Sequence, residues 1–145
     1  MGNKVEQLSI FLENRAGRLA EVTKVLSEAG INIRALSVAD TSDFGILRLI
    51  VSDNEKAKKV LKENGFTVKK TTVIPVEVED KPGGLYKILK ILQDKNINIE
   101  YMYAFVHHSG KDAILIFRFD RTEEALDLLK QHDIKVLTQE EISKL

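Results

Sequence analysis

The hydrophobic pattern of the chain changes between two periods, and each change marks an expected element. Apolar residues fill every second position in two stretches, which is typical of a strand with one buried face: Leu8, Ile10 and Leu12, and Ile74, Val76 and Val78. Each stretch is followed by apolar residues three and four apart, which predict a helix: Leu19, Val22, Val25, Leu26 and Ala29, and Leu85, Ile88, Leu89 and Leu92. Gly30 is expected to end the first helix.

The two patterns belong to an internal duplication. At an offset of 66 residues the sequence matches itself at several positions, among them Glu13 with Glu79, Gly17 with Gly83, Leu19 with Leu85, and Ile31-Asn32-Ile33 with Ile97-Asn98-Ile99. Beyond an insertion near residues 107–111 the offset becomes 68. We therefore expect two repeats, over residues 1–72 and 73–145.

The remaining elements follow the same order in both copies. Two strands joined by a polar turn come next, and then a second helix begins at capping-box spacings, Ser52 to Glu55 and Asp120 to Glu123. Closing strands are expected from Phe66 and from Ile134. The order strand, helix, strand, strand, helix, strand predicts an α+β fold of two ferredoxin-like βαββαβ units, each an antiparallel sheet with helices on one face.

The junction between the copies lacks a glycine- or serine-rich linker. The last strand of the first copy is therefore expected to run almost directly into the first strand of the second. Pro75 lacks an amide donor, which favours an edge or the start of a strand. Thr138 and Glu141 have the spacing to cap a short helix in the tail.

One strand of the second copy is apolar on both faces. Tyr101, Tyr103 and Phe105 alternate along it, and Ile114 and Ile116 add apolar side chains on the next strand, opposite the expected core face. Helices can cover only one face of such a sheet. We therefore expect another subunit or an extra segment to cover the other, which favours a homodimer.

Composition narrows the classes of function. The chain of 145 residues has no cysteine, which excludes disulfides and thiolate chemistry. Its formal net charge is zero, so no overall positive potential attracts nucleic acid. No apolar run approaches the roughly 18 residues of a membrane span, so we expect no membrane partner and a cytoplasmic location. No Ser-His-Asp arrangement, P-loop or dinucleotide motif occurs. The expectation is a non-catalytic protein without a cofactor or metal site.

Two matched turns are the candidate ligand sites, each between the first strand and the first helix. Their sequences are Asn14-Arg15-Ala16-Gly17-Arg18-Leu19 and Asp80-Lys81-Pro82-Gly83-Gly84-Leu85. Glycine lets a ligand approach the backbone, and the free amides of a helix start favour a carboxylate. Asn14 or Asp80 can accept from an ammonium group, so the turn suits the zwitterion of a free amino acid. Alternatively, glycine only shapes the turn, and these two side chains cap the helix.

These residues resemble the ACT domain family, in which Asp or Asn precedes a glycine and a leucine, and a hydrophobic-Asn-hydrophobic strand start follows. Both halves match, so the resemblance covers nearly the whole chain. It implies copies joined side by side into an eight-stranded sheet, with amino acids bound at the seams between copies. The residues placed at or near those seams are Asn14, Gly17, Arg18, Leu19, Ile33, Asp80, Gly83, Gly84, Leu85 and Ile99. The first copy has Ala16 and Arg18 where the second copy has Pro82 and Gly84, so the two sites need not be equivalent.

The function expected from this resemblance is regulatory. The chain would sense a free amino acid with a branched or otherwise apolar side chain. Binding would favour one arrangement of the halves or subunits and so change the surface that a partner enzyme of amino-acid metabolism contacts. A more distant similarity to the regulatory subunit of acetolactate synthase is limited, because that subunit carries one such copy and a different second domain. The alternative is an interaction or dimerisation module, a subunit of a biosynthetic enzyme without its own ligand.

Two weaker hypotheses concern other chemistry. The adjacent pair His107-His108 suggests a metal site, but neighbouring side chains of an extended segment point to opposite faces, which favours a hairpin turn instead. Arg18 with Asn32 imitates the pair used by acylphosphatases, which share this fold class, although fold analogy alone is a poor basis for assigning catalysis.

Overall fold

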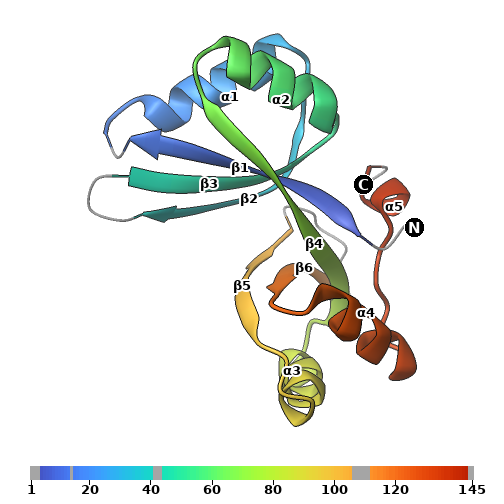
Figure 1. Cartoon of the computed structure of the whole chain (residues 1–145). Coiled ribbons are helices and arrows are strands. Elements are labelled where there is room, and N and C mark those ends of the chain that lie inside the picture. The colour runs from blue at the N-terminus through green and yellow to red at the C-terminus, as the bar shows by residue number, and fades with distance from the viewer. Residues whose placement is uncertain (1–3, 14, 41–43, 106–111, 144–145) are drawn as a thin grey trace. The chain divides into compact units, whose positions relative to one another are not determined.

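The computed structural model describes the whole chain except residues 1–3, 14, 41–43, 106–111 and 144–145 (Figure 1). Its contacts divide the chain into two compact units. The first unit is Glu6–Thr71, and the second contains the chain from Thr72 onward together with Lys4 and Val5. The repeat boundary expected between residues 72 and 73 stays a prediction about the duplication.

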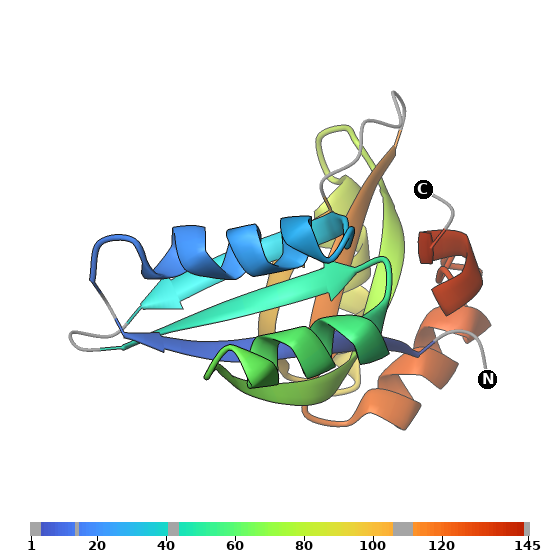
Figure 2. The same ribbon diagram turned by 90° about the horizontal axis from the view of Figure 1, so that it is seen from above.

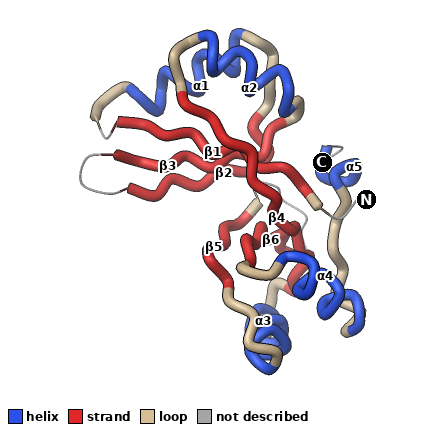
Figure 3. The backbone as a smooth tube through the Cα atoms, in the orientation of Figure 1, coloured by secondary structure: helices blue, strands red, loops and turns tan. Residues whose placement is uncertain are grey.

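The elements follow the βαββαβ order from β1 to β4, and from β4 onward they repeat it as far as its second helix. They are β1 (Val5–Glu13), α1 (Arg18–Glu28), β2 (Ile33–Asp40), β3 (Phe44–Val51), α2 (Asn54–Glu63), β4 (Thr67–Glu79), α3 (Gly84–Asp94), β5 (Ile99–Ala104), β6 (Asp112–Phe119), α4 (Thr122–Gln131) and α5 (Gln139–Ser143). Figure 3 shows the alternation of strands and helices along the chain. The expected α+β class of two ferredoxin-like units is confirmed.

In the first unit, α1 and α2 cover one face of the strands (Figures 1 and 2). β3 pairs antiparallel with both β1 and β2, and the register places Leu8 beside Leu49 and Ile10 beside Leu47. These strand residues form a buried core with the apolar positions of the helices, which include Val22, Leu26, Ala57 and Leu61. The period of two in β1 and the spacing of three and four in α1 therefore bring their apolar faces together.

The second unit repeats this arrangement with a shorter closing strand. β6 pairs antiparallel with β4 and β5, and the rings of Phe117 and Phe119 stack at 5.4 Å within the core. The strand expected from Ile134 is present only as a single bridge between Val76 and Val136. Two backbone hydrogen bonds support it, one from Glu77 N to Lys135 O and one from Leu137 N to Pro75 O, both 2.9 Å.

Strand β4 serves both units, because its 13 residues run from the core of the first into the core of the second. The direct connection between the copies is thus confirmed. The expected eight strands are wrong: the hydrogen-bonded order β2-β3-β1-β4-β6-β5 contains six, since one strand is shared and the closing segment is a bridge.

Pro75 lies inside β4 and not at its end. Its carbonyl accepts a hydrogen bond from Leu137, so the amide that it lacks would point toward the closing segment and not toward β6. The missing donor therefore interrupts only the edge where pairing is already reduced to one bridge.

All four long helices end in the same way. The second residue after each helix, which follows the C-cap, has a positive φ angle. The amide of the next residue reaches back to the carbonyl five positions earlier, as in a Schellman motif. The left-handed residues are Gly30 and Gly65 in the first unit and Asn96 and Asp133 in the second. Gly30 therefore ends α1 as predicted. The apolar residues that follow are Ile31, Phe66, Ile97 and Ile134.

The predicted capping boxes of the second helices are wrong. The cap of α2 is Asp53, which accepts from the amide of Lys56, and α4 begins after Arg121 without a side-chain cap. Ser52 and Asp120 instead accept hydrogen bonds from the amides of Asn32 and Asn98, at 3.0 and 3.1 Å. Both residues therefore tie the start of a neighbouring strand to the helix start.

The apolar residues expected on the second face of the second unit are buried. Tyr103 lies beside Ile116 across β5 and β6, as predicted. Ile116 has no exposed surface, and Ile114 and Phe105 are only 7% exposed, although none of these three belongs to the core of the unit. The homodimer stays a prediction.

The left-handed helix ends yield a stability test. A left-handed residue with a side chain costs about 1 kcal/mol relative to glycine, and asparagine and aspartate pay less than most. We expect Asp133→Gly to raise the free energy of unfolding by about 0.5 kcal/mol. Gly65→Ala, at the equivalent position of the first unit, should lower it by about 1 kcal/mol. Urea denaturation measures both, and a destabilised Asp133→Gly variant would contradict this account.

The tail helix α5 has the predicted capping box. Thr138 Oγ1 accepts from the amide of Glu141 at 3.0 Å, and the Glu141 carboxylate accepts from the amide of Thr138 at 2.9 Å. That amide, followed by the Lys135 ammonium group at 3.1 Å, lowers the pKa of Glu141 below its usual value. Ile142 is fully buried, so the tail is fixed by one apolar contact and one cap.

This cap predicts a pH dependence. The pKa of Glu141 is lower in the folded state than in the unfolded state, so the ionised carboxylate stabilises the fold at neutral pH. This stabilisation declines once the pH falls below the unfolded-state pKa, and it is lost as the pH falls through the folded-state pKa. Glu141→Gln keeps the acceptor oxygen and removes the charge. The difference in unfolding free energy between the two proteins should therefore shrink from pH 7 toward pH 3, measured by urea denaturation at each pH. A constant difference would show that the charge has no role.

Candidate functional site

The glycine turn of the second unit leaves backbone donors exposed. Lys81 donates its amide to Glu79 O, and Gly84 donates to Lys81 O, both at 3.0 Å, so these two amides are used within the turn. The amides of Gly83, Leu85 and Tyr86 have no acceptor in the described part of the chain. They are the start of α3, where the helix dipole is positive.

The two glycines of this turn have different roles. Gly83 has a φ angle of 86°, and a Cβ there would meet no atom within 4 Å, so its surroundings are open. A Cβ at Gly84 would overlap the carbonyl oxygen of Glu79, so packing alone requires glycine at this position. The open side of Gly83 is therefore where a ligand can approach the backbone.

The alternative in which a side chain caps this helix is not supported for Asp80. The N-cap of α3 is Gly83, and no side chain caps it. Asp80 is exposed and makes no hydrogen bond or ion pair with any described residue. Its carboxylate is therefore available beside the free amides.

The turn of the first unit is built in the same way. Gly17 has a φ angle of 89° with open space around it, and the amides of Leu19 and Ala20 have no acceptor among the residues that the structure describes. Asn14 lies outside the described residues. The Glu13 carboxylate lies 3.5 Å from both Arg15 Nε and Arg18 Nε, so the charges next to this turn are largely balanced.

Arg18 is held in place by its own unit. Its guanidinium group lies 4.6 Å from the centre of the Phe66 ring and bonds Glu21 at 2.8 Å, and only 16% of the side chain is exposed. The position matches Gly84, where no side chain fits. Arg18 thus connects the start of α1 to Phe66, in the segment between α2 and β4. Asn32 lies beyond the other end of α1, so the acylphosphatase-like pair does not form.

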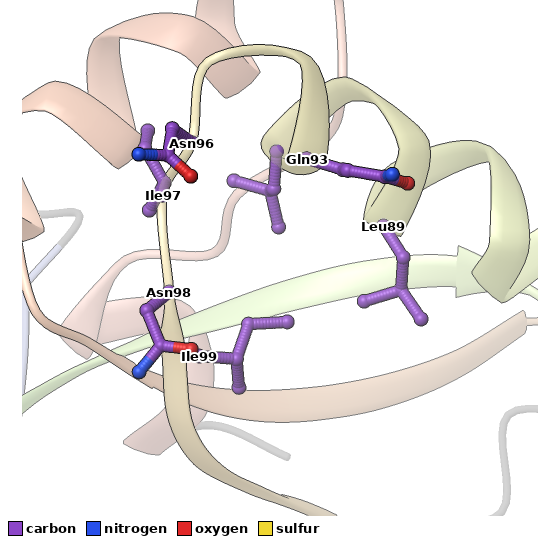
Figure 4. A pocket seen from close by; sticks show the side chains of 7 residues that line it. Leu89, Gln93, Asn96, Ile97, Asn98 and Ile99 are labelled. Carbon is purple, nitrogen blue, oxygen red and sulfur yellow. The ribbon is translucent and has the colours of Figure 1, made fainter.

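The other predicted strand residues, Ile33 and Ile99, line two hollows that correspond residue by residue. One hollow, of about 370 Å³, is lined by Leu89, Leu92, Gln93, Asn96, Ile97, Asn98 and Ile99 (Figure 4). The other, of about 410 Å³, is lined by Thr23, Leu26, Ser27, Gly30, Ile31, Asn32 and Ile33. Every position differs by the offset of 66, and no side chain in either hollow carries a charge.

Hydrogen bonds hold the wall of each hollow. Beside the hollow of the second unit, Arg121 donates to the carbonyl oxygens of Lys95 and Asn96, at 3.1 and 2.5 Å, and so satisfies the end of α3. The bonds from Asn98 to Asp120 and from Asn32 to Ser52 fix the strand starts in the two units. The hollows are therefore preformed surfaces open to solvent.

The turn and the hollow of one unit do not meet. They lie at opposite ends of a helix of 11 residues, which is about 16 Å long at the usual rise. The structure therefore brings Gly17 together with Leu19, and Gly83 with Asp80 and Leu85, but it keeps Ile33 and Ile99 apart from the turns. A free amino acid is too small to touch both ends of the helix.

Three residues near these surfaces were not predicted. Tyr86 follows the turn of the second unit with a free amide and a ring that is 64% exposed, and Gln93 and Asn96 border its hollow. The sequence match at Ile97-Asn98-Ile99 pointed to the hollow. Nothing in the sequence pattern separated these polar side chains from ordinary surface residues. His107 and His108 lie outside the described residues.

Two exposed glycine turns and two uncharged hollows thus lie on a pair of ferredoxin-like units. The sequence matches the family model of the ACT domain pair over residues 3–145, and the chain therefore belongs to the ACT domain pair family. None of the described helices is long and apolar enough to cross a membrane.

Individual relatives agree with this assignment. The chain is 37% identical over 76 residues to the acetolactate synthase small subunit of Buchnera aphidicola, a match over 51% of this chain and 47% of that subunit. The crystal structure of protein BT0572 from Bacteroides thetaiotaomicron is 41% identical, with a TM-score of 0.93 and 99% of each chain covered. The regulatory subunit of aspartate kinase from Thermus thermophilus shares the fold, with a TM-score of 0.63 and 16% identity over 90% of this chain and 93% of that one.

The two glycines of the second turn should respond differently to alanine. Gly83→Ala places a methyl group in open space and costs only the left-handed conformation, about 1 kcal/mol. Gly84→Ala forces Cβ into the Glu79 carbonyl and should cost about 3 kcal/mol. Chemical denaturation of both variants checks the order, and equal losses would show that the turn relaxes around Gly84.

Proposed function

We propose that the protein is a non-catalytic regulator that binds a free amino acid at the seam between two ACT units. The observation that carries this proposal is the set of free amides at both turns, beside a glycine whose open side lets a ligand approach. Family membership supports the same function, because it covers both units.

The backbone of the turn would recognise the parts common to all amino acids. Amides at the start of a helix stabilise a carboxylate through hydrogen bonds and the positive end of the dipole. In the second unit, the free amides of Leu85 and Tyr86 supply these donors. The unpaired carboxylate of Asp80 supplies an acceptor for the α-ammonium group. Leu19 and Ala20 supply the equivalent donors in the first unit.

The hollow would select the side chain. A charged ligand side chain placed in an uncharged hollow loses hydration without gaining a partner, which is unfavourable. An apolar side chain gains contact with Ile99 and Leu89, or with Ile33 and Leu26. Gln93 and Asn96 of the second hollow replace Ser27 and Gly30 of the first, and Leu89 replaces Thr23, so the two hollows would differ in preference.

Both halves of such a site must come from different units. The turn and the hollow of one unit are separated by the length of α1 or α3, so a single ligand contacts both only where one unit's turn faces another unit's hollow. Ligand binding then favours one arrangement of the units. The coupling would amount to about 1 to 3 kcal/mol, as is usual for allosteric ligands.

The regulated partner would be an enzyme of amino-acid metabolism. The relative named as the acetolactate synthase small subunit is a subunit of such an enzyme, and the chain spans about half its length. We extend from it only the role of a separate subunit that acts on a catalytic chain in the cytoplasm. The branched-chain or otherwise apolar ligand fits the uncharged hollows.

The test is a thermal-shift screen with each of the twenty amino acids, followed by calorimetric titration of any that raises the midpoint. A ligand that binds only the folded protein must stabilise it. We expect an uncharged amino acid to shift the midpoint. Gly17→Asp and Gly83→Asp place a carboxylate at the turns and should weaken binding at least tenfold at whichever turn is used.

Gly65→Asp is the matched control. Gly65 has a similar φ angle of 85° and equally open surroundings, but it follows α2 and belongs to neither turn. Binding should be unchanged in this variant. If no amino acid shifts the midpoint, or if both turn variants bind as the parent does, the proposed site is wrong, and a module without its own ligand becomes the better account.

A further inference from the structure

The second helices of the two units carry opposite charges at corresponding positions. At the offset of 68 residues, Lys56 and Lys59 of α2 correspond to Glu124 and Asp127 of α4. Two buried positions of each helix hold the same alanine and leucine. The two copies therefore share the packing of this helix but not the charge of its outer face.

The outer face of α2 is basic, and its cations lack counter-ions. The lysines of this basic face are Lys56, Lys58, Lys59 and Lys62. None of these ammonium groups forms an ion pair with a described residue. Of the two carboxylates on the helix, Glu55 is bound by Lys70, and Glu63 is exposed without a partner in the described part of the chain. Lysines on a helix surface are ordinarily only solvated, so a partner is indicated only where another surface matches their order.

The corresponding side of α4 borders a groove of about 340 Å³, the α4 groove. Its lining residues are Lys95, Ile97, Glu124, Asp127, Leu128 and Gln131. Among the described residues, Asp127 makes no hydrogen bond or ion pair, and Glu124 is bound only by Arg121, at 2.8 Å. Ile97 and Leu128 are 7% and 6% exposed, so apolar atoms form the floor. The groove thus combines available carboxylates with an apolar base.

We propose that α2 of a second copy of this chain docks antiparallel on the α4 groove. The facing pairs are Lys56 with Asp127, Lys59 with Glu124, and Glu63 with Arg121. Spacings of three and four residues keep each set along one side of its helix, and the antiparallel order makes all three pairs opposite in charge. In the parallel order Glu63 would meet Gln131, and the third pair would be lost.

The lysine side chains suit the groove in two ways. Their aliphatic stems can cover Ile97 and Leu128 while the ammonium groups reach the carboxylates at the rim. Lys62 and Lys130 have the same charge in both copies, but each lies roughly 90° around its helix from the facing residues. The like charges therefore lie beside the contact and not within it.

A second copy is the partner that these observations favour, because every copy carries both surfaces. In a symmetric pair each copy gives its α2 to the other, so the contact forms twice. Exposed ion pairs contribute little individually, and complementary charge supplies specificity and rapid encounter more than affinity. We therefore expect a weak association that salt reduces. It uses neither glycine turn and does not depend on a bound amino acid.

The first experiment reverses the charges in steps. Sedimentation equilibrium in low salt, from micromolar to millimolar protein, should show reversible self-association of the parent. Lys56→Glu with Lys59→Glu should weaken this association about tenfold. Adding Glu124→Lys and Asp127→Lys should restore it, and this four-position variant keeps the parent's net charge of zero. Restored association therefore reports complementary surfaces and not overall charge.

A control variant changes the net charge away from both surfaces. Lys24→Glu with Lys87→Glu alters two exposed lysines outside α2 and α4 by the same total charge and should leave the association intact. Self-association that is absent in the parent, unaffected by Lys56→Glu with Lys59→Glu, or not restored in the four-position variant would overturn the proposal. Binding of polyphosphate to a parent that does not self-associate would assign the basic face to a polyanion and overturn it as well.

The second experiment tests proximity and uses the absence of native cysteine. Lys59→Cys and Glu124→Cys proteins, one of them isotopically labelled, are mixed under mild oxidation. Mass spectrometry should find the mixed disulfide dimer in excess of either self-pair, because these positions face each other across the contact. A statistical mixture of the three dimers would overturn the antiparallel docking. A parent that self-associates as described but binds no amino acid would overturn the proposed function alone.

Discussion

The two turns that begin α1 and α3 impose the constraint on which the rest depends. A helix cannot satisfy its own first amides, and no side chain of the described residues satisfies them, because the cap in both units is a left-handed glycine. These donors are accessible, because no described atom lies within 4 Å of a Cβ built at Gly17 or Gly83. The Arg18 side chain packs against the Phe66 ring. The fold thus maintains an unsatisfied set of donors in two copies, which favours an anionic group from outside.

The same local interactions recur in both units and fix the strands and helices next to these turns. The same left-handed ending closes each long helix, and the same pair of bonds ties the start of β2 or β5 to the following helix. The copies have nevertheless diverged in chemistry. Gly30 and Gly65 of the first unit correspond to Asn96 and Asp133 of the second. Arg18 occupies the position that corresponds to Gly84, where no side chain fits. The backbone has therefore been kept more strictly than the surface.

The sequence predicted most of the fold, because its signals are local. Periodicity located β1, α1 and their copies, and the spacing of Thr138 and Glu141 revealed the cap of α5. The capping boxes at Ser52 and Asp120 were wrong because a strand amide competes for the same oxygen, which is a tertiary effect that spacing does not show. The count of eight strands was wrong because the duplication hides a shared strand. For the turns, the motif located the glycines, but only coordinates separate the open surroundings of Gly83 from the filled space beside Gly84.

Strand β4 also limits how such a protein can change over time. Val68 belongs to the core of one unit, and Ile74, Val76 and Val78 belong to the core of the other, on one unbroken strand. A deletion or recombination event that ended the chain between the copies would cut this strand and expose apolar residues in both halves. Losing one copy as a separate piece would therefore destabilise the copy that remains, whereas surface residues of either copy can change without touching this strand.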